Sequence, residues 1–231
     1  MFISTSKHKA AQATLLASFL LLLLTGETAM SYEEPDYTVV YRDGDLEYRQ
    51  YEPYLVSETV IDTARDADAA SKEGFRRLFR YITGANKSQS KISMTTPVSQ
   101  SASEKISMTV PVQQAAAENG WRVSFALPAD YTMETAPQPA DPRVYVREVP
   151  GRLMAVKRFA GRWTESNYTE NERELERLLA EQDLALVGEI ERAAYNAPFS
   201  LPFFRRNEVM VAVNRLPESA MAAGEAATAV Y

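Results

Sequence analysis

The chain has 231 residues, a formal net charge of −6 and no cysteine. This length allows one large domain or two small ones, and the acidic balance lacks the basic footprint of a nucleic-acid-binding protein. The absence of cysteine excludes disulfides, thiol catalysis and thiolate metal sites. An apolar content of 45% is ordinary for a globular protein with a packed core.

The first 31 residues have the pattern of an export signal. Lys7, His8 and Lys9 form a positive region. The apolar run at residues 15–24 is shorter than the stretch that a membrane-spanning helix normally needs. Small residues at positions 29 and 31 predict cleavage before Tyr32. We therefore expect a signal peptide over residues 1–31, a domain over residues 32–216 and a disordered tail over residues 217–231. The protein would be periplasmic or extracellular without a stable membrane anchor, or else tethered to the membrane by an uncleaved N-terminal segment.

The only histidine, His8, lies inside the predicted signal peptide. The mature chain would then have no imidazole, which excludes a histidine general base, a histidine-based triad and a histidine metal ligand. The sequence also contains no nucleophile elbow and no phosphate-binding loop. We therefore expect a binding protein rather than an enzyme, with no catalytic residue and no resident metal site.

The first half of the mature chain begins with predicted strands. Residues 37–41 alternate, Asp43-Gly44 is a two-residue hairpin turn because glycine accepts a positive φ, and the chain returns through residues 46–50. Residues 54–61 alternate again and include β-branched side chains, which favours a further strand.

A first helix is predicted from a cap at Asp66 or Asp68 to about Ile82. Its apolar stripe consists of Phe75, Leu78, Phe79 and Ile82. A basic row beside the stripe consists of Lys72, Arg76 and Arg80. We expect the stripe to face the core, and the basic row to be either a solvated face or a cationic rim that receives ligand carboxylates beside an aromatic wall.

An eight-residue motif, Lys-Ile-Ser-Met-Thr-x-Pro-Val, occurs at residues 91–98 and again at residues 105–112. Its apolar residues lie two apart, so we expect two antiparallel strands joined by the small polar residues between them. Met94 and Met108 would either fill gaps in the core or line a ligand cavity.

The second half contains further predicted strands and a second helix. Residues 121–127 form a strand, and residues 144–149 and 153–160 form a hairpin about the turn Pro150-Gly151. The helix begins near Thr164, and its inner face consists of Tyr168, Leu175, Leu178, Leu179 and Gln182. Residues 186–195 lead into a loop rich in proline and phenylalanine, and residues 209–213 form a last, central strand.

This order of elements predicts an α+β domain, in which a curved antiparallel sheet or open barrel packs against two helices. Spaced motifs along it resemble those of the SOUL haem-binding family. They are residues 92–98 with their repeat, Phe125-Ala126-Leu127-Pro128, Phe159-Ala160-Gly161, Tyr195-Asn196-Ala197-Pro198 and Arg205-Arg206-Asn207-Glu208-Val209. The resemblance covers residues 37–213 and implies a distorted antiparallel β-barrel flanked by two helices, with pseudo-twofold duplication. It also implies non-covalent binding of haem or a related tetrapyrrole.

Members of this family hold the macrocycle through a histidine on the iron, or in an apolar groove between the first helix and the loop before the last strand. The second mode suits this chain, and the groove residues would be Lys72, Phe75, Arg76, Leu78, Phe79, Arg80, Tyr195, Phe199, Phe203 and Phe204. A haem has an apolar face and two propionates, which suit aromatic side chains beside lysine and arginine. If the iron were ligated, tyrosine, methionine and lysine remain as donors, with Tyr195 the first candidate.

Other interpretations of the same residues stay open. The phenylalanine-rich loop would otherwise plug the end of the barrel, and Arg206 or Arg205 with Glu208 would form a structural ion pair or bind an anion. The protein would otherwise bind another apolar, anionic small molecule, or act as an enzyme on a tetrapyrrole. The sequence does not indicate an oligomeric state.

Overall fold

A computed structural model describes residues 33–88, 104–118, 120–197 and 199–220. Nine of its strands form one antiparallel sheet in the order β1-β2-β9-β11-β10-β5-β6-β3-β8, and the short strands β4 (Asn86–Lys87) and β7 (Gln138–Pro139) pair separately. The predicted α+β class is confirmed. In the described part of the chain the sheet has two edges, β1 and β8, and is not closed into a barrel.

The first hairpin is confirmed. Strand β1 (Tyr37–Asp43) pairs with β2 (Leu46–Tyr51), and the two-residue loop is Gly44-Asp45, one position later than predicted. Gly44 has φ +56°, a conformation that glycine adopts without a Cβ clash.

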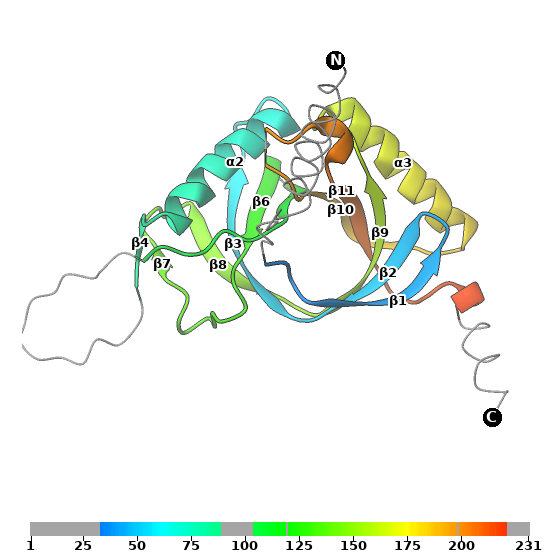
Figure 1. The fold of residues 1–231 in the computed structure, drawn as a ribbon, viewed down its shortest axis with the longest axis horizontal. Helices are drawn as coiled ribbons and strands as arrows, with labels where there is room; N and C mark the ends of the chain where they lie inside the picture. The colour runs from blue at the N-terminus through cyan, green and yellow to red at the C-terminus, as the bar shows by residue number, and fades with distance from the viewer. Residues whose placement is uncertain (1–32, 89–103, 119, 198, 221–231) are drawn as a thin grey trace, which may run out of the picture. The chain divides into compact units, whose positions relative to one another are not determined.

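Two units with the same order of elements make up most of the sheet (Figure 1). The first is β3 (Tyr54–Ile61), α2 (Ala67–Ile82), β5 (Val112–Ala117) and β6 (Gly120–Ala126). The second is β9 (Arg152–Phe159), α3 (Glu165–Glu181), β10 (Leu186–Ala194) and β11 (Asn207–Val213). Because β10 pairs with β5, the strands of the two units are arranged symmetrically about this central pair, β9-β11-β10 on one side and β5-β6-β3 on the other.

The predicted hairpin about Pro150-Gly151 is wrong, although both of its strands exist. Strand β8 (Val144–Val149) pairs with β3, whereas β9 lies between β2 and β11. The register runs on across the interruption, with Tyr51 opposite Arg152 and Tyr54 opposite Val149. Pro150-Gly151 therefore interrupts a long antiparallel pairing, in which β2 pairs with β9 and β3 pairs with β8.

The second copy of the repeated motif is not the predicted strand, because β5 begins only at Val112. Its backbone amides pair elsewhere: Ile106 N–H donates to Ile82 O at 2.9 Å, and Val110 N–H donates to Glu33 O at 2.9 Å. Ile106 is buried, and the half-buried Met108 packs against the same core cluster as α2. The first copy, with Met94, lies outside the described residues.

Helix α2 has the predicted cap, since the Asp66 carboxylate accepts from Ala69 N–H at 2.8 Å. Its inward face is rotated from the predicted stripe. The buried residues are Ala67, Ala70, Gly74, Leu78, Tyr81 and Ile82. Phe79, predicted to face the core, is 41% exposed, and Phe75 is half-buried. The reason is steric: Gly74 lies against Val123, so close that a Cβ on Gly74 would be 2.6 Å from the valine side chain.

Helix α3 agrees with its prediction. Thr164 is the cap, and Tyr168, Leu175 and Leu179 are buried in a second core cluster with β2, β9 and β11. Both helices lie above the curved sheet in Figure 1, α2 over the strands of the first unit and α3 over those of the second. Their N-terminal ends approach each other over the central pair β5–β10.

Candidate functional site

A cavity of about 350 Å³ lies between the N-terminal halves of α2 and α3. Its lining residues are Ala67, Asp68, Ser71, Lys72, Phe75, Val112, Gln114, Trp163, Thr164, Glu165, Tyr168, Arg192, Ala194 and Asn196. The central strands β5 and β10 supply its floor, and the two helices supply its walls. Elements from both units are therefore needed to form this cavity, which we call the interhelix cavity.

Three aromatic side chains give the interhelix cavity its apolar character. Phe75 comes from α2, Trp163 precedes α3, and Tyr168 lies one turn inside α3. Phe75 stacks on Phe79 with ring centroids 5.7 Å apart and planes 12° apart. The aromatic surface therefore continues from the cavity along α2 to the exposed Phe79.

The charges around the interhelix cavity are paired. Arg192 is buried in the floor and forms ion pairs with Glu165 at 2.8 Å and Glu172 at 2.6 Å. Burial opposes its charge, but these two carboxylates outweigh burial and raise the pKa of Arg192. At the mouth, Lys72 Nζ lies 2.6 Å from an Asp68 carboxylate oxygen, and both side chains are exposed. Lys72 can therefore turn to a ligand at little cost.

Tyr168 is a neutral phenol at physiological pH. Burial, its largest cause, raises the pKa of Tyr168 to about 12. Its ring lies below the Arg192 guanidinium, 5.1 Å from the ring centroid. The cavity wall therefore offers a polarised aromatic face rather than an anion.

The loop between β10 and β11, residues 195–206, borders the interhelix cavity. Asn196 is part of the lining, and the Arg205 guanidinium lies 4.3 Å from the ring centroid of Trp163. The loop also contacts the segment before α3, since Gly161 N–H donates to Pro202 O at 2.9 Å. The side chains of Phe199, Phe203 and Phe204 are largely exposed and lie outside the lining.

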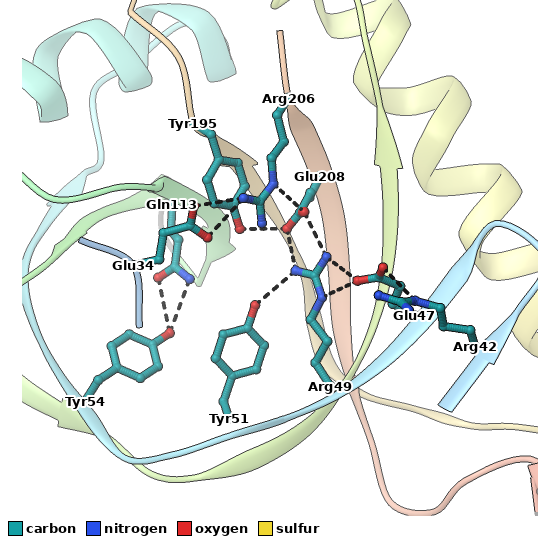
Figure 2. A network of polar contacts seen from close by, with 10 residues as sticks. All are labelled: Glu34, Arg42, Glu47, Arg49, Tyr51, Tyr54, Gln113, Tyr195, Arg206 and Glu208. Atoms are coloured by element: carbon teal, nitrogen blue, oxygen red, sulfur yellow. Dashed lines mark hydrogen bonds and ion pairs between the residues drawn. The ribbon is translucent and has the colours of Figure 1, made fainter. Parts of the chain in front are cut away.

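A buried polar network holds the base of this loop (Figure 2). Glu208 is fully buried at its centre and accepts from Arg49 at 2.8 Å, Arg206 at 2.9 Å and the Tyr195 hydroxyl at 2.6 Å. Arg206 also pairs with Glu34 at 2.8 Å. The predicted structural ion pair between Arg206 and Glu208 is confirmed.

Charge–charge attraction decides the ionisation of this network. Burial raises the pKa of Glu208, but hydrogen bonds and attraction from Arg49, Arg206 and Tyr195 together hold that pKa below its usual value. Burial and the neighbouring Glu208 carboxylate raise the pKa of Tyr195 well above its ordinary value. The Tyr195 phenol is thus neutral and donates a hydrogen bond to Glu208, within a core cluster separate from the lining of the interhelix cavity.

The remaining predicted groove residues are dispersed. Leu78 is fully buried in the core below α2. Arg76 pairs with Glu73 on its own helix at 2.6 Å. Arg80 lines a different surface depression, beside Asp141 and Arg143. Of the ten residues assigned from the sequence, the structure places only Lys72 and Phe75 in the interhelix cavity.

Comparison with known proteins identifies the family. A family model described as SOUL heme-binding protein matches residues 32–212. The chain belongs to the SOUL heme-binding protein family. Heme-binding protein 2 of Mus musculus is 27% identical over 169 residues, which cover 72% of this chain and 77% of the mouse protein. Heme-binding protein 1 of Xenopus laevis is 26% identical over 164 residues, covering 71% of this chain and 81% of the frog protein.

Among solved structures, the EcmrR C-terminal domain matches 78% of this SOUL protein and 99% of its own chain. The TM-score is 0.49 and the sequence identity 9%, a likeness too weak to bear on function. Haem is therefore the ligand indicated by family membership and by the names of the sequence relatives. These relatives are named for binding rather than for a reaction.

Sequence reasoning missed several residues that line the cavity of this SOUL protein, chiefly Gln114, Trp163 and Arg192. Trp163 follows the motif Phe159-Ala160-Gly161 closely, which was a usable signal. Gln114 and Arg192 had none, because they lie opposite each other only once β5 and β10 pair.

Two further observations concern the part of the chain that the structure describes. It contains no group of three or more histidine, aspartate or glutamate side chains arranged to hold a metal ion. In the same residues, no helix combines the length and apolar character required to cross a bilayer.

Proposed function

We propose that this SOUL protein binds haem or a related tetrapyrrole non-covalently in the interhelix cavity, as a binding protein and not as an enzyme. The observation that carries the proposal is the aromatic wall formed by Phe75, Trp163 and Tyr168 over a floor from both units. Flat apolar walls with a few polar groups at the mouth are typical of small-molecule sites. A porphyrin ring presents large apolar faces that such walls can cover.

The residues present fit one edge of the macrocycle better than the whole of it. A cavity of about 350 Å³ is at the small end for ligand sites. The stacked pair Phe75–Phe79 extends the aromatic surface beyond the cavity, where the outer part of the ring would lie. Lys72 at the mouth would then receive a propionate, and Arg76, one turn further along α2, would be the second candidate.

We propose that histidine does not ligate the iron. The single histidine of the chain, His8, precedes the domain, and the nearest phenols are protonated. Bound haem would supply its own redox chemistry at the iron. The chain's contribution would be to cover the ring, orient the propionates and exclude water from one face.

The test is titration of the protein with haem and with metal-free protoporphyrin, followed by absorbance and by tryptophan fluorescence. We expect saturable binding of both, with dissociation constants within a few-fold of each other, because the iron is not ligated. Phe75→Ala should weaken both about tenfold, since a stacked aromatic face is lost. Leu186→Ala, an exposed apolar residue at the far end of β10, is the matched control and should bind normally.

Failure of haem to saturate the protein in the micromolar range would reject the tetrapyrrole. One observation favours a second candidate, another apolar anionic small molecule: the cavity of about 350 Å³ is small for a whole macrocycle and would hold a smaller ligand with Lys72 at its mouth. Such a ligand would compete with haem and would be sensitive to Phe75→Ala. We also propose that the protein is exported, for which the N-terminal sequence of the purified protein is the test; a start at Met1 would contradict it.

A further inference from the structure

The loop between β10 and β11 presents the most exposed large apolar side chains of the described residues. Phe199 is 90% exposed, Phe204 74%, Phe203 66% and Leu201 55%. Elsewhere in the described chain the highest value for such a residue is 50%, at Val187. Isolated exposed apolar residues are normal, but a cluster of four within six positions indicates an interaction site.

The tip of this loop is held in place. Its short helix η1 (Pro202–Phe204) is closed by Phe204 N–H to Leu201 O at 3.0 Å and Arg205 N–H to Pro202 O at 3.2 Å. Its base is closed by Tyr195 N–H to Arg206 O at 3.2 Å, directly above the Glu208 network of Figure 2. The backbone that carries the exposed rings is therefore held at both its tip and its base.

The surroundings of the tip are basic, although the chain as a whole is acidic. Residues 193–207 contain two arginines and no acid, and so do residues 158–163, which contact the loop through Gly161 and Pro202. Arg206 is neutralised by Glu34 and Glu208. The nearest acid at the start of α3, Glu165, is paired with Arg192. Arg158 and Arg162 are exposed beside the loop.

We propose that this loop inserts into the interfacial layer of a membrane that contains anionic lipids. The rings of Phe199, Phe203 and Phe204 would enter the boundary between headgroups and acyl chains, and Arg158 and Arg162 would contact the headgroups. A ring exposed on nearly every side, as Phe199 is, protrudes from the surface. A fluid lipid layer can surround such a ring, whereas a protein partner would need a cavity shaped for it.

This inference reassigns three residues that sequence reasoning gave to the haem site. The interhelix cavity opens beside the loop but does not include their side chains. Membrane contact would then hold the mouth of the cavity close to the lipid surface, because Asn196 and Trp163 link loop and cavity. The two roles are separable, since they use different side chains.

The test is co-sedimentation of the full chain with vesicles of phosphatidylcholine alone, or with phosphatidylglycerol added. Three variants are compared: Phe203→Ser with Phe204→Ser, Arg162→Ser, and the control Leu186→Ser with Val187→Ser, which removes two other exposed apolar residues. All proteins keep residues 1–31, so any binding by that segment is common to all. Haem titration of each variant provides the second measurement.

We expect the phenylalanine variant to bind anionic vesicles at least tenfold more weakly than the wild type, with unchanged haem affinity. Arg162→Ser should weaken binding about fivefold on anionic vesicles and not on phosphatidylcholine. The control should bind like the wild type. Vesicle binding unchanged in the phenylalanine variant overturns the proposal. So does loss of haem binding alone, which returns the loop to the haem site.

Discussion

The helices α2 and α3 occupy equivalent places in the two units, yet different interactions attach them to the sheet. The N-terminal half of α2 faces the sheet with small residues, and Gly74 allows direct contact with Val123. Helix α3 faces it with the large side chains Tyr168 and Leu175. With small residues turned inward on the N-terminal half of α2, Phe75 is only half-buried and Phe79 is exposed, so only this helix presents a stacked phenylalanine pair beside the cavity.

The two central strands show the same contrast at opposed positions. On β5, Gln114 donates from its side-chain amide to Ala67 O at 2.7 Å and so attaches the start of α2. Directly opposite on β10, Arg192 attaches the start of α3 through Glu165 and Glu172. The hairpins differ too: β5 and β6 are joined by two residues, whereas β10 and β11 are joined by residues 195–206. In the second unit, therefore, ion pairs attach the helix to its central strand, and this unit also contains the long loop.

The largest expected effect comes from the carboxylate that anchors the second unit. Glu208→Gln should lower the free energy of unfolding by about 3–5 kcal/mol, because it leaves the buried Arg49 with only the partly exposed Glu47 as a counter-charge and removes the charged partner of Arg206 inside the network. The first unit also contains a buried carboxylate, Glu58 on β3, and Glu58→Gln should cost less, since its partner Arg147 keeps contact with water. Urea unfolding of both variants measures the difference. Equal losses would remove the distinction between the units.

Lowering the pH should also reveal how much Glu208 contributes to stability. The pKa of Glu208 is depressed in the folded state, so its contribution to stability is complete above the unfolded carboxyl pKa of about 4.3. That contribution is lost as the pH falls through the lower, folded pKa. We expect Glu208→Gln to lose thermal stability less steeply than the wild type between pH 5 and pH 3. The difference in slope should correspond to about one fewer proton taken up on unfolding. The slope is reduced and not abolished, because Glu165 and Glu47 also have lowered pKa values.

The helix anchors should differ by a smaller amount. Arg192→Met should cost about 2–3 kcal/mol, as hydrogen bonds to charged groups are lost. Gln114→Met should cost about 1 kcal/mol for one neutral hydrogen bond. Denaturant midpoints at constant m-value would measure both, and hydrogen exchange should show faster opening of α3 in the first variant and of α2 in the second. A reversed order would show that the ionic anchor is the weaker one.

The smallest effect tests the close approach of α2. Gly74→Ala should destabilise by about 1–2 kcal/mol although alanine is the better helix former, because its Cβ would overlap Val123. In a Val123→Ala background this cost should shrink, because the two γ-methyl groups are gone and only the Cβ of residue 123 remains close, which a double-mutant cycle would detect. Glu170→Ala, a solvent-facing change on α3, should be within about 0.5 kcal/mol of neutral. A stabilising Gly74→Ala in the wild-type background would contradict the packing.

Local features followed from the sequence alone. The cap at Asp66, one of two predicted, the start of α3 near Thr164 and the strand at residues 54–61 are as predicted, and the first hairpin is shifted in its turn by one residue. Each depends on neighbouring residues: a side-chain oxygen at a helix start, β-branched alternation, or a glycine in a turn. The inner face of α3 was also readable, since large apolar residues mark it. The spaced motifs were sufficient to identify the SOUL family, which the match to residues 32–212 confirms.

Only the tertiary structure decided which strands pair and which face of a helix is buried. Pro150-Gly151 has the composition of a turn, but the chain continues through it because β2–β3 offers β8 and β9 one long antiparallel partner. Helix α2 buries alanine and glycine in place of Phe79, since close packing on Val123 outweighs the burial of a ring. The interhelix cavity combines Phe75, Gln114, Trp163 and Arg192 from distant segments. Contacts of this kind depend on which surfaces the assembled sheet brings together, and periodicity along one segment carries no information about them.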